Sequence, residues 1–96
     1  MTRIRISSEA ERDIDEIAAY TMSTWGSRQT GRYLAKLEKG IDLLATTPSA
    51  GRKCDQVRAG LHRFEIESHV VFYLIETGGI LVVRILHQQM LPSDNF

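Results

Sequence analysis

A hydrophobic stretch at residues 69–87, HVVFYLIETGGILVVRILH, predicts a β-hairpin. Two apolar runs flank Thr77-Gly78-Gly79, and a Gly-Gly pair suits the positive φ values of a tight hairpin turn. Both arms are apolar on both faces, whereas a strand with one wet face alternates apolar and polar side chains. Arg84 interrupts the second arm. The pattern predicts a hairpin that is buried on two sides, so two other parts of the molecule, or a partner, have to cover it.

The residues before this hairpin predict two helices joined by a short break. Ser8 is followed three residues later by Glu11, which fits a capping box, so we expect Ser8 to begin the first helix. We expect Gly26 to lie at the break, and Ser27 to cap the second helix. Pro48 should end that helix, because the residue before a proline is pushed out of the helical region.

Each predicted helix carries one apolar stripe with spacings of three and four residues, which is typical of a helix with one buried face. The two stripes are Ala10, Ile14, Ile17 and Ala18 in the first helix, and Leu34, Leu37, Ile41 and Leu44 in the second. A break this short favours an antiparallel pair of helices.

Two further segments predict strands. Residues 3–6 alternate, with both isoleucines on one face, and residues 61–67 alternate with Phe64 and Ile66 on one face. Residues 48–60 are rich in loop formers and have no periodicity, so we interpret them as a connection. The chain 1–96 is therefore expected to be one α+β domain of order β-α-α-β-β-β. Its antiparallel helical hairpin packs on one face of a twisted, mainly antiparallel sheet.

Two helices cover only one face of a sheet of about four strands, so one apolar face of residues 70–86 is left over. Large exposed apolar patches on monomers often mark interaction sites. We therefore expect this face to dock a partner. The alternative is that the C-terminal tail, the 48–60 segment or a dimer contact covers it.

Composition narrows the class of protein. Hydrophobic content of 43% and charged content of 25% are ordinary for a globular domain, and a net charge of zero argues against a generic polyanion binder. Acids gather in residues 9–16 and cations in residues 28–63. The single Cys54 excludes an intrachain disulfide and is expected to be a buried, inert thiol. No signal peptide or membrane span is recognised, which predicts a cytoplasmic protein.

Motifs for chemistry are few, so we assign no catalytic, cofactor-binding or metal-ligating residue. The three histidines have no metal-ligand spacing, and there is no nucleophile elbow and no phosphate-binding loop. Arg63, Arg84 and His87, with Tyr73 nearby, could converge on a sheet surface for RNA cleavage. Arginine is a poor proton carrier because it stays charged, and the predicted sheet contains no lysine.

Taken together, the order and spacing of several short pieces resemble the ParE toxins of bacterial type II toxin–antitoxin systems, from about residue 4 to residue 91. These pieces are Tyr20, Trp25-Gly26, Tyr33-Leu34, Thr47-Pro48, Gly51-Arg52, Val57–Leu61, His69–Tyr73, Val83–His87 and Met90. The resemblance implies the RelE/ParE fold. RelE-like members cut mRNA in the ribosome, whereas ParE-like members poison DNA gyrase so that cleaved DNA accumulates. This sequence falls on the ParE side.

The resemblance also implies partners. A ParD-like antitoxin, itself a dimeric DNA-binding protein, is expected to wrap the toxin with its C-terminal segment, and gyrase is the expected target. DNA is then reached only indirectly, through the antitoxin or gyrase, and no membrane is involved. Two alternatives stay open, a ribosome-dependent mRNA endonuclease and a degenerate member that binds its antitoxin without toxicity. Candidate antitoxin- or target-binding residues are Trp25, Tyr33, Arg58, Arg63, Phe64, Tyr73, Arg84, His87 and Met90.

Overall fold

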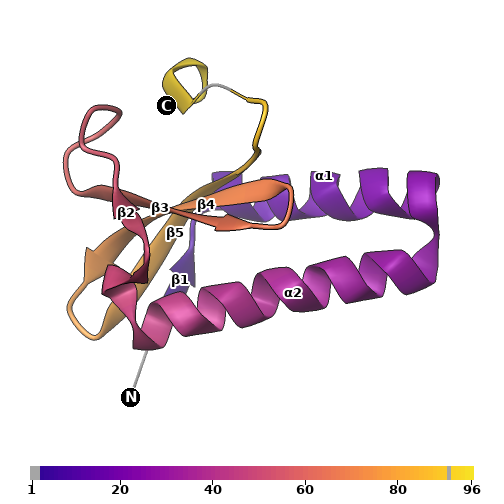
Figure 1. Cartoon of the computed structure of the whole chain (residues 1–96), viewed down its shortest axis with the longest axis horizontal. Helices are drawn as coiled ribbons and strands as arrows, with labels where there is room; N and C mark the ends of the chain where they lie inside the picture. Colours follow the sequence, from indigo (N-terminus) through magenta and orange to yellow (C-terminus); the bar gives the residue numbers. More distant parts are fainter. Residues whose placement is uncertain (1–2, 91) are drawn as a thin grey trace.

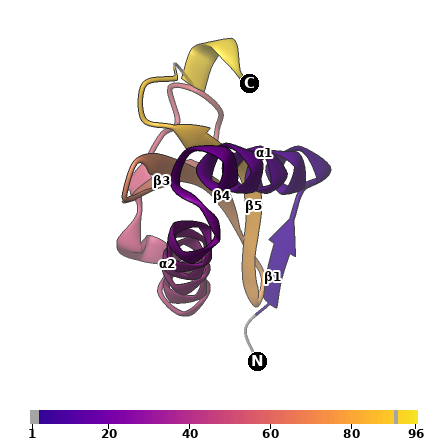
Figure 2. The same ribbon diagram turned by 90° about the vertical axis from the view of Figure 1, so that its right-hand side faces the viewer.

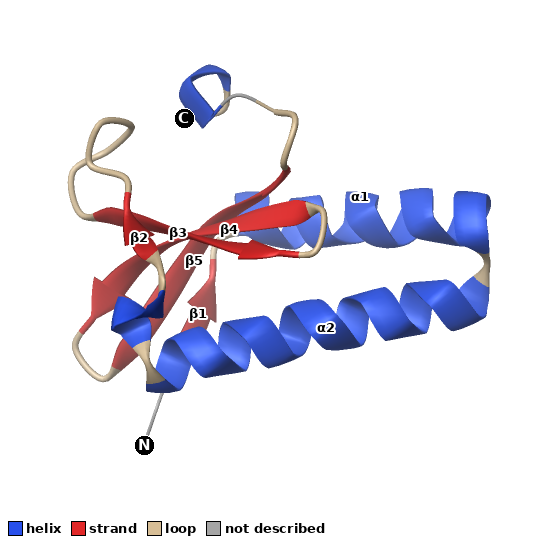
Figure 3. Ribbon diagram, viewed as in Figure 1, coloured by secondary structure: helices blue, strands red, loops and turns tan. Residues whose placement is uncertain are grey.

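The computed structural model describes residues 3–90 and 92–96, which form two helices and five strands (Figures 1 and 3). In chain order these are β1 (Arg3–Ile6), α1 (Ser8–Trp25), α2 (Ser27–Thr46), β2 (Arg52–Lys53), β3 (Leu61–Ile66), β4 (His69–Glu76) and β5 (Gly79–His87). Single 3-10 turns lie at Pro48–Ala50 and Pro92–Asp94. In this part of the chain, neither helix is long and apolar enough to cross a lipid bilayer.

The strands form one sheet in the order β1-β5-β4-β3-β2, in which β1 is parallel to β5 and all other neighbours are antiparallel. The α+β class and the mainly antiparallel sheet are confirmed. The interpretation of residues 48–60 as a plain connection was wrong, because Arg52 and Lys53 pair with Arg63 and His62 as an edge strand. Two residues are too few to carry a recognisable alternation.

The ends of the helices also differ from the prediction by one residue. Ser7, not Ser8, caps α1: its hydroxyl accepts a hydrogen bond from the Ala10 N–H at 3.0 Å and donates one to the Val83 carbonyl at 2.7 Å. Gly26 has a φ of 85° and both ends α1 and begins α2, so Ser27 lies inside the helix and makes no cap. The positive φ of Gly26 reverses the chain without a longer loop.

The β4–β5 hairpin forms as predicted, but its two glycines have separate roles. The turn is Thr77-Gly78, and only Gly78 has a positive φ, of 79°. Gly79 is already in β5, where a Cβ atom would collide with the backbone of Arg3. The second glycine therefore allows β1 to approach β5, and the first makes the turn.

A β-bulge at Val83 decides which way the second arm of the hairpin faces. Phe72 pairs with Arg84 while Tyr73 pairs with Val82, so Val83 has no partner opposite it. The extra residue resets the alternation. Arg84 consequently shares the face of Phe72 rather than that of the helix-side core.

Both helices pack on one face of the sheet, and Figure 2 looks onto their connected end with the strands behind. The residues buried there form the helix-side core, as the apolar stripes predicted. It consists of Ala10, Ile17, Leu37, Ile41, Leu44, Ala45, Ile66, Val71, Tyr73, Ile80, Val82 and Ile85, with Ile6, Ile14, Tyr33, Leu34 and Phe64 partly buried against it.

The opposite face is not left over, so the expectation of an uncovered docking face was wrong. Its residues form the far-side core of Cys54, Leu61, Val70, Phe72 and Leu86, with Val57, Leu74 and Val83 partly buried against it. The segment after β2 brings Cys54 and Val57 over the sheet, and the ring of Phe96 meets Phe72 edge-on at 5.3 Å between centroids. The alternative, a cover made by the 48–60 segment and the tail, is what the structure shows. Cys54 is a buried thiol, as expected.

Candidate functional site

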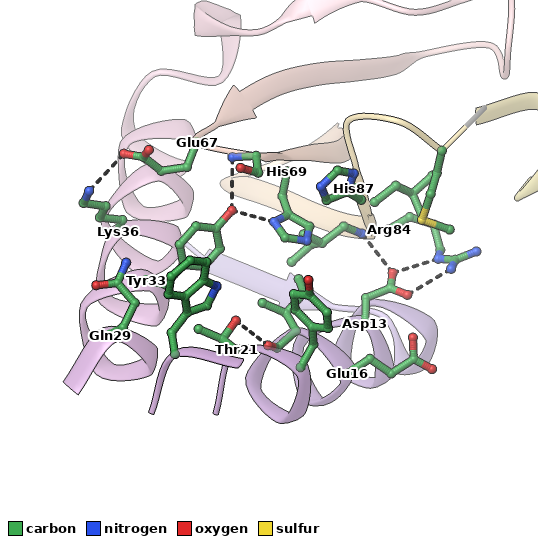
Figure 4. Close-up of a pocket in the computed structure, with 17 residues that line it drawn as sticks. Asp13, Glu16, Thr21, Gln29, Tyr33, Lys36, Glu67, His69, Arg84 and His87 are labelled. Carbon is green, nitrogen blue, oxygen red and sulfur yellow. Dashed lines mark hydrogen bonds and ion pairs between the residues drawn. The ribbon is translucent and has the colours of Figure 1, made fainter. Parts of the chain in front are cut away.

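A cleft of about 650 Å³ opens between the helical hairpin and the end of the sheet where β4 begins and β5 ends (Figure 4). Both helices run past the edge of the sheet, so their connected end has no strand beneath it (Figure 1). Side chains from α1, α2, the β3–β4 turn and β5 line the cleft. Five of the predicted binding residues are among them: Trp25, Tyr33, Arg84, His87 and Met90.

The rim of the cleft is apolar and exposed. Tyr20 and Trp25, near the end of α1, are each 68% exposed, and Met90, after β5, is 43% exposed. Ile17 is buried in the cleft wall. Large apolar side chains that surround a concave site are typical anchors for a partner segment or a ligand.

One wall of the cleft is a polar chain built on Tyr33. Its hydroxyl accepts a hydrogen bond from the Ser68 N–H at 3.1 Å and lies 2.6 Å from His69 Nδ1. A hydroxyl that accepts from the backbone has its own proton free to donate to that nitrogen, so the ring proton of neutral His69 is assigned to Nε2. The Tyr33 and His69 rings meet edge-on at 5.5 Å.

Burial lowers the pKa of His69, and the neighbouring His87 lowers it further, while Asp13 acts in the opposite direction. The two imidazoles lie edge-on, with 5.4 Å between their centroids. His87 Nδ1 accepts a hydrogen bond from the Gln89 N–H at 3.2 Å. His69 is thus held neutral at physiological pH, and it supplies the wall with a hydrogen-bonding group rather than a charge.

The other wall holds an ion pair between Asp13 of α1 and Arg84 of β5. The Asp13 carboxylate accepts from Arg84 Nε at 2.8 Å and Nη2 at 2.9 Å, and from the Ile85 N–H at 2.9 Å. Arg84 Nη1 also donates to the Asn95 carbonyl at 2.9 Å. The hydrogen bond with Asp13 raises the pKa of Arg84 above its ordinary value. Because this guanidinium is held within the chain, its contact with a partner stays a prediction.

Asp13 has a structural role that explains its burial. The paired part of β1 ends opposite Val82, so the next stretch of β5 has an open edge. The carboxylate satisfies the Ile85 N–H on that edge and the arginine beside it. The signal in the sequence was an aspartate three residues after Ala10 and four before Ile17, on the apolar stripe of α1. A buried acid at such a position needs a cation or donors.

The remaining predicted residues lie outside the cleft. Tyr73 is fully buried, where its hydroxyl accepts from the Gly51 N–H at 3.0 Å and donates to the Pro48 carbonyl at 2.6 Å. Burial raises the pKa of Tyr73. Phe64 is partly buried against the helix-side core, and Arg58 is exposed in the segment before β3. These contacts make Tyr73 a structural residue that anchors the chain before β2.

The predicted cluster for RNA cleavage is brought together only in part, because Arg84 and His87 both line the cleft while Tyr73 is buried in the helix-side core. Arg63 and Arg84 flank Phe72 on the far side of the sheet, with the Arg63 guanidinium 5.6 Å from the ring centroid. His87 pairs with His69 across the β4–β5 hairpin and lines the cleft, as Arg84 does. The carboxylates next to the two arginines are Glu65 and Asp13. Within residues 3–90 and 92–96, no three His, Cys, Asp or Glu side chains are grouped for a metal ion.

Comparison of the sequence with known proteins identifies the family of this chain. Residues 4–92 match the family model for the ParE toxin of the type II toxin–antitoxin system parDE. The chain is 38% identical over 90 residues to Toxin ParE1 of Mycobacterium tuberculosis, which covers 93% of this chain and 92% of the relative. It is 40% identical over 91 residues to Toxin ParE of Escherichia coli, covering 94% and 88%.

A solved structure, the chromosomal ParDE system from P. aeruginosa, has the same fold. It superimposes with a TM-score of 0.77 over 91% of this chain and 96% of that chain, at 15% sequence identity. The two chains thus share their architecture although most of their side chains differ.

Proposed function

The chain belongs to the ParE toxin family of type II toxin–antitoxin systems, and on that premise we propose that it inhibits DNA gyrase and is neutralised by a ParD-like antitoxin. The observation that carries the proposal is the family match across residues 4–92. The inhibition is proposed to be non-enzymatic: the protein stabilises the cleaved gyrase–DNA complex by binding it.

The surroundings of the arginines support a non-enzymatic mechanism. Metal-free RNA cleavage needs a base for the 2′-hydroxyl proton and an acid for the leaving oxygen. Arg63 and Arg84 can stabilise a phosphate but do not transfer protons at physiological pH. The Arg84 guanidinium is moreover already held by the Asp13 carboxylate and the Asn95 carbonyl.

We propose the cleft as the site where an antitoxin segment docks. Its exposed Tyr20, Trp25 and Met90 offer apolar anchors, and the Tyr33–His69 wall offers hydrogen bonds. An amphipathic helix or strand that lays its apolar side chains into a groove uses these features. The far-side core, which we had expected to be open, is already filled by the chain itself.

Purified gyrase with relaxed plasmid and ATP tests the toxin activity. The expected result is loss of supercoiling and accumulation of cleaved plasmid, both abolished when the antitoxin is added first. Full supercoiling without cleaved plasmid, at an excess of the protein over gyrase, would disprove gyrase inhibition. Expression without antitoxin should also arrest growth, and normal growth would support a degenerate member.

Binding of the antitoxin tests the cleft. Trp25→Ala should weaken the complex by about 2 kcal/mol, roughly 30-fold in Kd, because tryptophan is among the residue types that most often dominate the affinity of an interface. Leu43→Ala is the matched control, since Leu43 is 47% exposed on α2 and does not line the cleft. If calorimetry gives the two variants equal affinities for the antitoxin, the antitoxin binds elsewhere than in the cleft.

A further inference from the structure

The connected end of the helical hairpin has an unusual distribution of charge. Residues 17–37 contain Arg28, Arg32 and Lys36 and not one aspartate or glutamate. Residues 9–16 contain five acids and one arginine. Because α1 and α2 are antiparallel, the second half of α1 lies beside the first half of α2, away from the acids (Figures 1 and 2). The projecting end of the hairpin is therefore purely cationic.

Three of the cations on α2 form one exposed ridge. Spacings of four and seven residues place Arg28, Arg32 and Lys39 within about 40° of one another around the helix and over about 16 Å of its length. All three are exposed, and the ridge lies opposite the buried stripe that contains Leu37 and Ile41.

These three cations are not neutralised by the protein. Within the described ranges 3–90 and 92–96, the ion pairs involve other cations, and none includes Arg28, Arg32 or Lys39. The fourth cation of this side of α2, Lys36, pairs with Glu67 at 3.1 Å. Because none of the three makes an ion pair in this part of the chain, their charges are free to meet an external anion.

The shape and composition of the ridge favour DNA over an acidic protein. The cores of protein–protein interfaces are depleted of lysine and built around aromatic or apolar anchors, which this convex ridge does not offer between Arg28 and Lys39. Phosphates repeat along DNA and are contacted mainly by arginine and lysine. A helix of about 10–12 Å diameter also fits a major groove about 12 Å wide.

We propose that the exposed ridge of α2 binds the sugar–phosphate backbone of duplex DNA, with Arg28, Arg32 and Lys39 each neutralising a phosphate. The inference extends the proposed function, because it gives the toxin a direct contact with the DNA that gyrase holds. It departs from the expectation that DNA is reached only through gyrase or the antitoxin.

Fluorescence anisotropy of a labelled DNA duplex with the full chain, in the absence of gyrase, tests the ridge. Between 50 and 200 mM salt, three phosphate contacts predict a slope of log K against log salt of about −2.7. The double variant R28Q/R32Q should lower the magnitude of that slope by about 1.8. The control R12Q/R58Q makes the same change in net charge outside the ridge and should leave the slope unchanged.

Three results would overturn the proposal. They are absence of salt-dependent binding by the wild type, an equal effect of the control variant, and an unchanged DNA affinity of R28Q/R32Q together with weaker binding of the antitoxin. The last would make the ridge a protein contact. Because gyrase is left out, DNA binding is scored independently of whether supercoiling is inhibited.

Discussion

The two faces of the β4–β5 hairpin are buried to the same degree by very different means. On one face, two regular helices supply the helix-side core, where Leu44 and Val82 are fully buried. On the other, an irregular segment and the tail cover the far-side core, where Phe72 and Leu86 are 1% exposed. The helices that cover one face are recognisable in the sequence by a repeating apolar stripe. The irregular cover of the other face consists of single residues, such as Cys54 and Phe96, that follow no period. An apolar pattern therefore tells that a face is buried, but periodicity identifies the cover only when the cover is a helix or strand.

The stability contributed by the two cores can be compared directly by removing one leucine from each. Leu44→Ala and Leu86→Ala should each lower the free energy of unfolding by about 2–5 kcal/mol, because both side chains are fully or almost fully buried. We expect the smaller loss for Leu86→Ala, since an irregular cover can relax into the cavity. Urea denaturation measures both, and a loss below about 0.5 kcal/mol for Leu86→Ala would show that the far-side core contributes little.

The ion pair that ties α1 to the far side of β5 gives the next largest effect. Asp13→Ala should cost about 3 kcal/mol, because it leaves a guanidinium and the Ile85 N–H without their acceptor. The Arg84 side chain is only 21% exposed, so water replaces the carboxylate incompletely. Asp15→Ala, on the exposed side of the same helix, is the control. Similar stabilities of the two variants in urea would contradict the role given to Asp13.

The tail tests how firmly the irregular cover is held. Phe96→Ala should lower the free energy of unfolding by about 1 kcal/mol, the usual worth of an edge-on aromatic pair, because the ring contacts Phe72 while remaining 42% exposed. Ile75→Ala, at 47% exposure, should change it by less than about 0.5 kcal/mol. If Phe96→Ala has no larger effect than Ile75→Ala, the tail does not stabilise the far-side core.

The smallest expected effect on stability comes from His69, in the wall of the cleft. The pKa of His69 is lowered in the folded protein, so its proton binds more strongly in the unfolded chain. The contribution of neutral His69 is fully present well above about pH 6.5 and is lost as the pH falls through that unfolded value. Stability should therefore decrease on acidification, and His69→Gln should decrease less. Urea melts at neutral and mildly acidic pH compare the two, and identical pH dependences would contradict this.

Most of the fold was predictable because it depends on short-range patterns. The stripe of Leu34, Leu37, Ile41 and Leu44 predicted the buried face of α2, and Gly26 predicted the turn between the helices. The helix cap is Ser7 rather than the predicted Ser8. Ser7 also donates a hydrogen bond to β5, and this contact depends on the assembled sheet. The strand β2 was missed for the same reason, since its two residues become a strand only by pairing with β3.

The candidate site was predictable only in part. Trp25, Tyr33, Arg84, His87 and Met90 were selected from the sequence and line one cleft. Asp13 and His69 were not selected, although both set the polarity of its walls. Asp13 and Arg84 are 71 positions apart, and no local pattern pairs residues at that separation. The one clue was an aspartate on an apolar stripe.

By itself, the sequence determined the two helices with their apolar stripes, the strands other than β2, and the doubly buried hairpin, because local periodicity and turn residues act over a few positions. Only the tertiary structure decided what covers the second face of that hairpin and where its arginine points. The bulge at Val83 places Arg84 on the face of Phe72, Asp13 of α1 then holds its guanidinium, and Cys54, Val57 and Phe96 close the face. Such contacts join residues far apart in the chain, so they exist only once the sheet has formed.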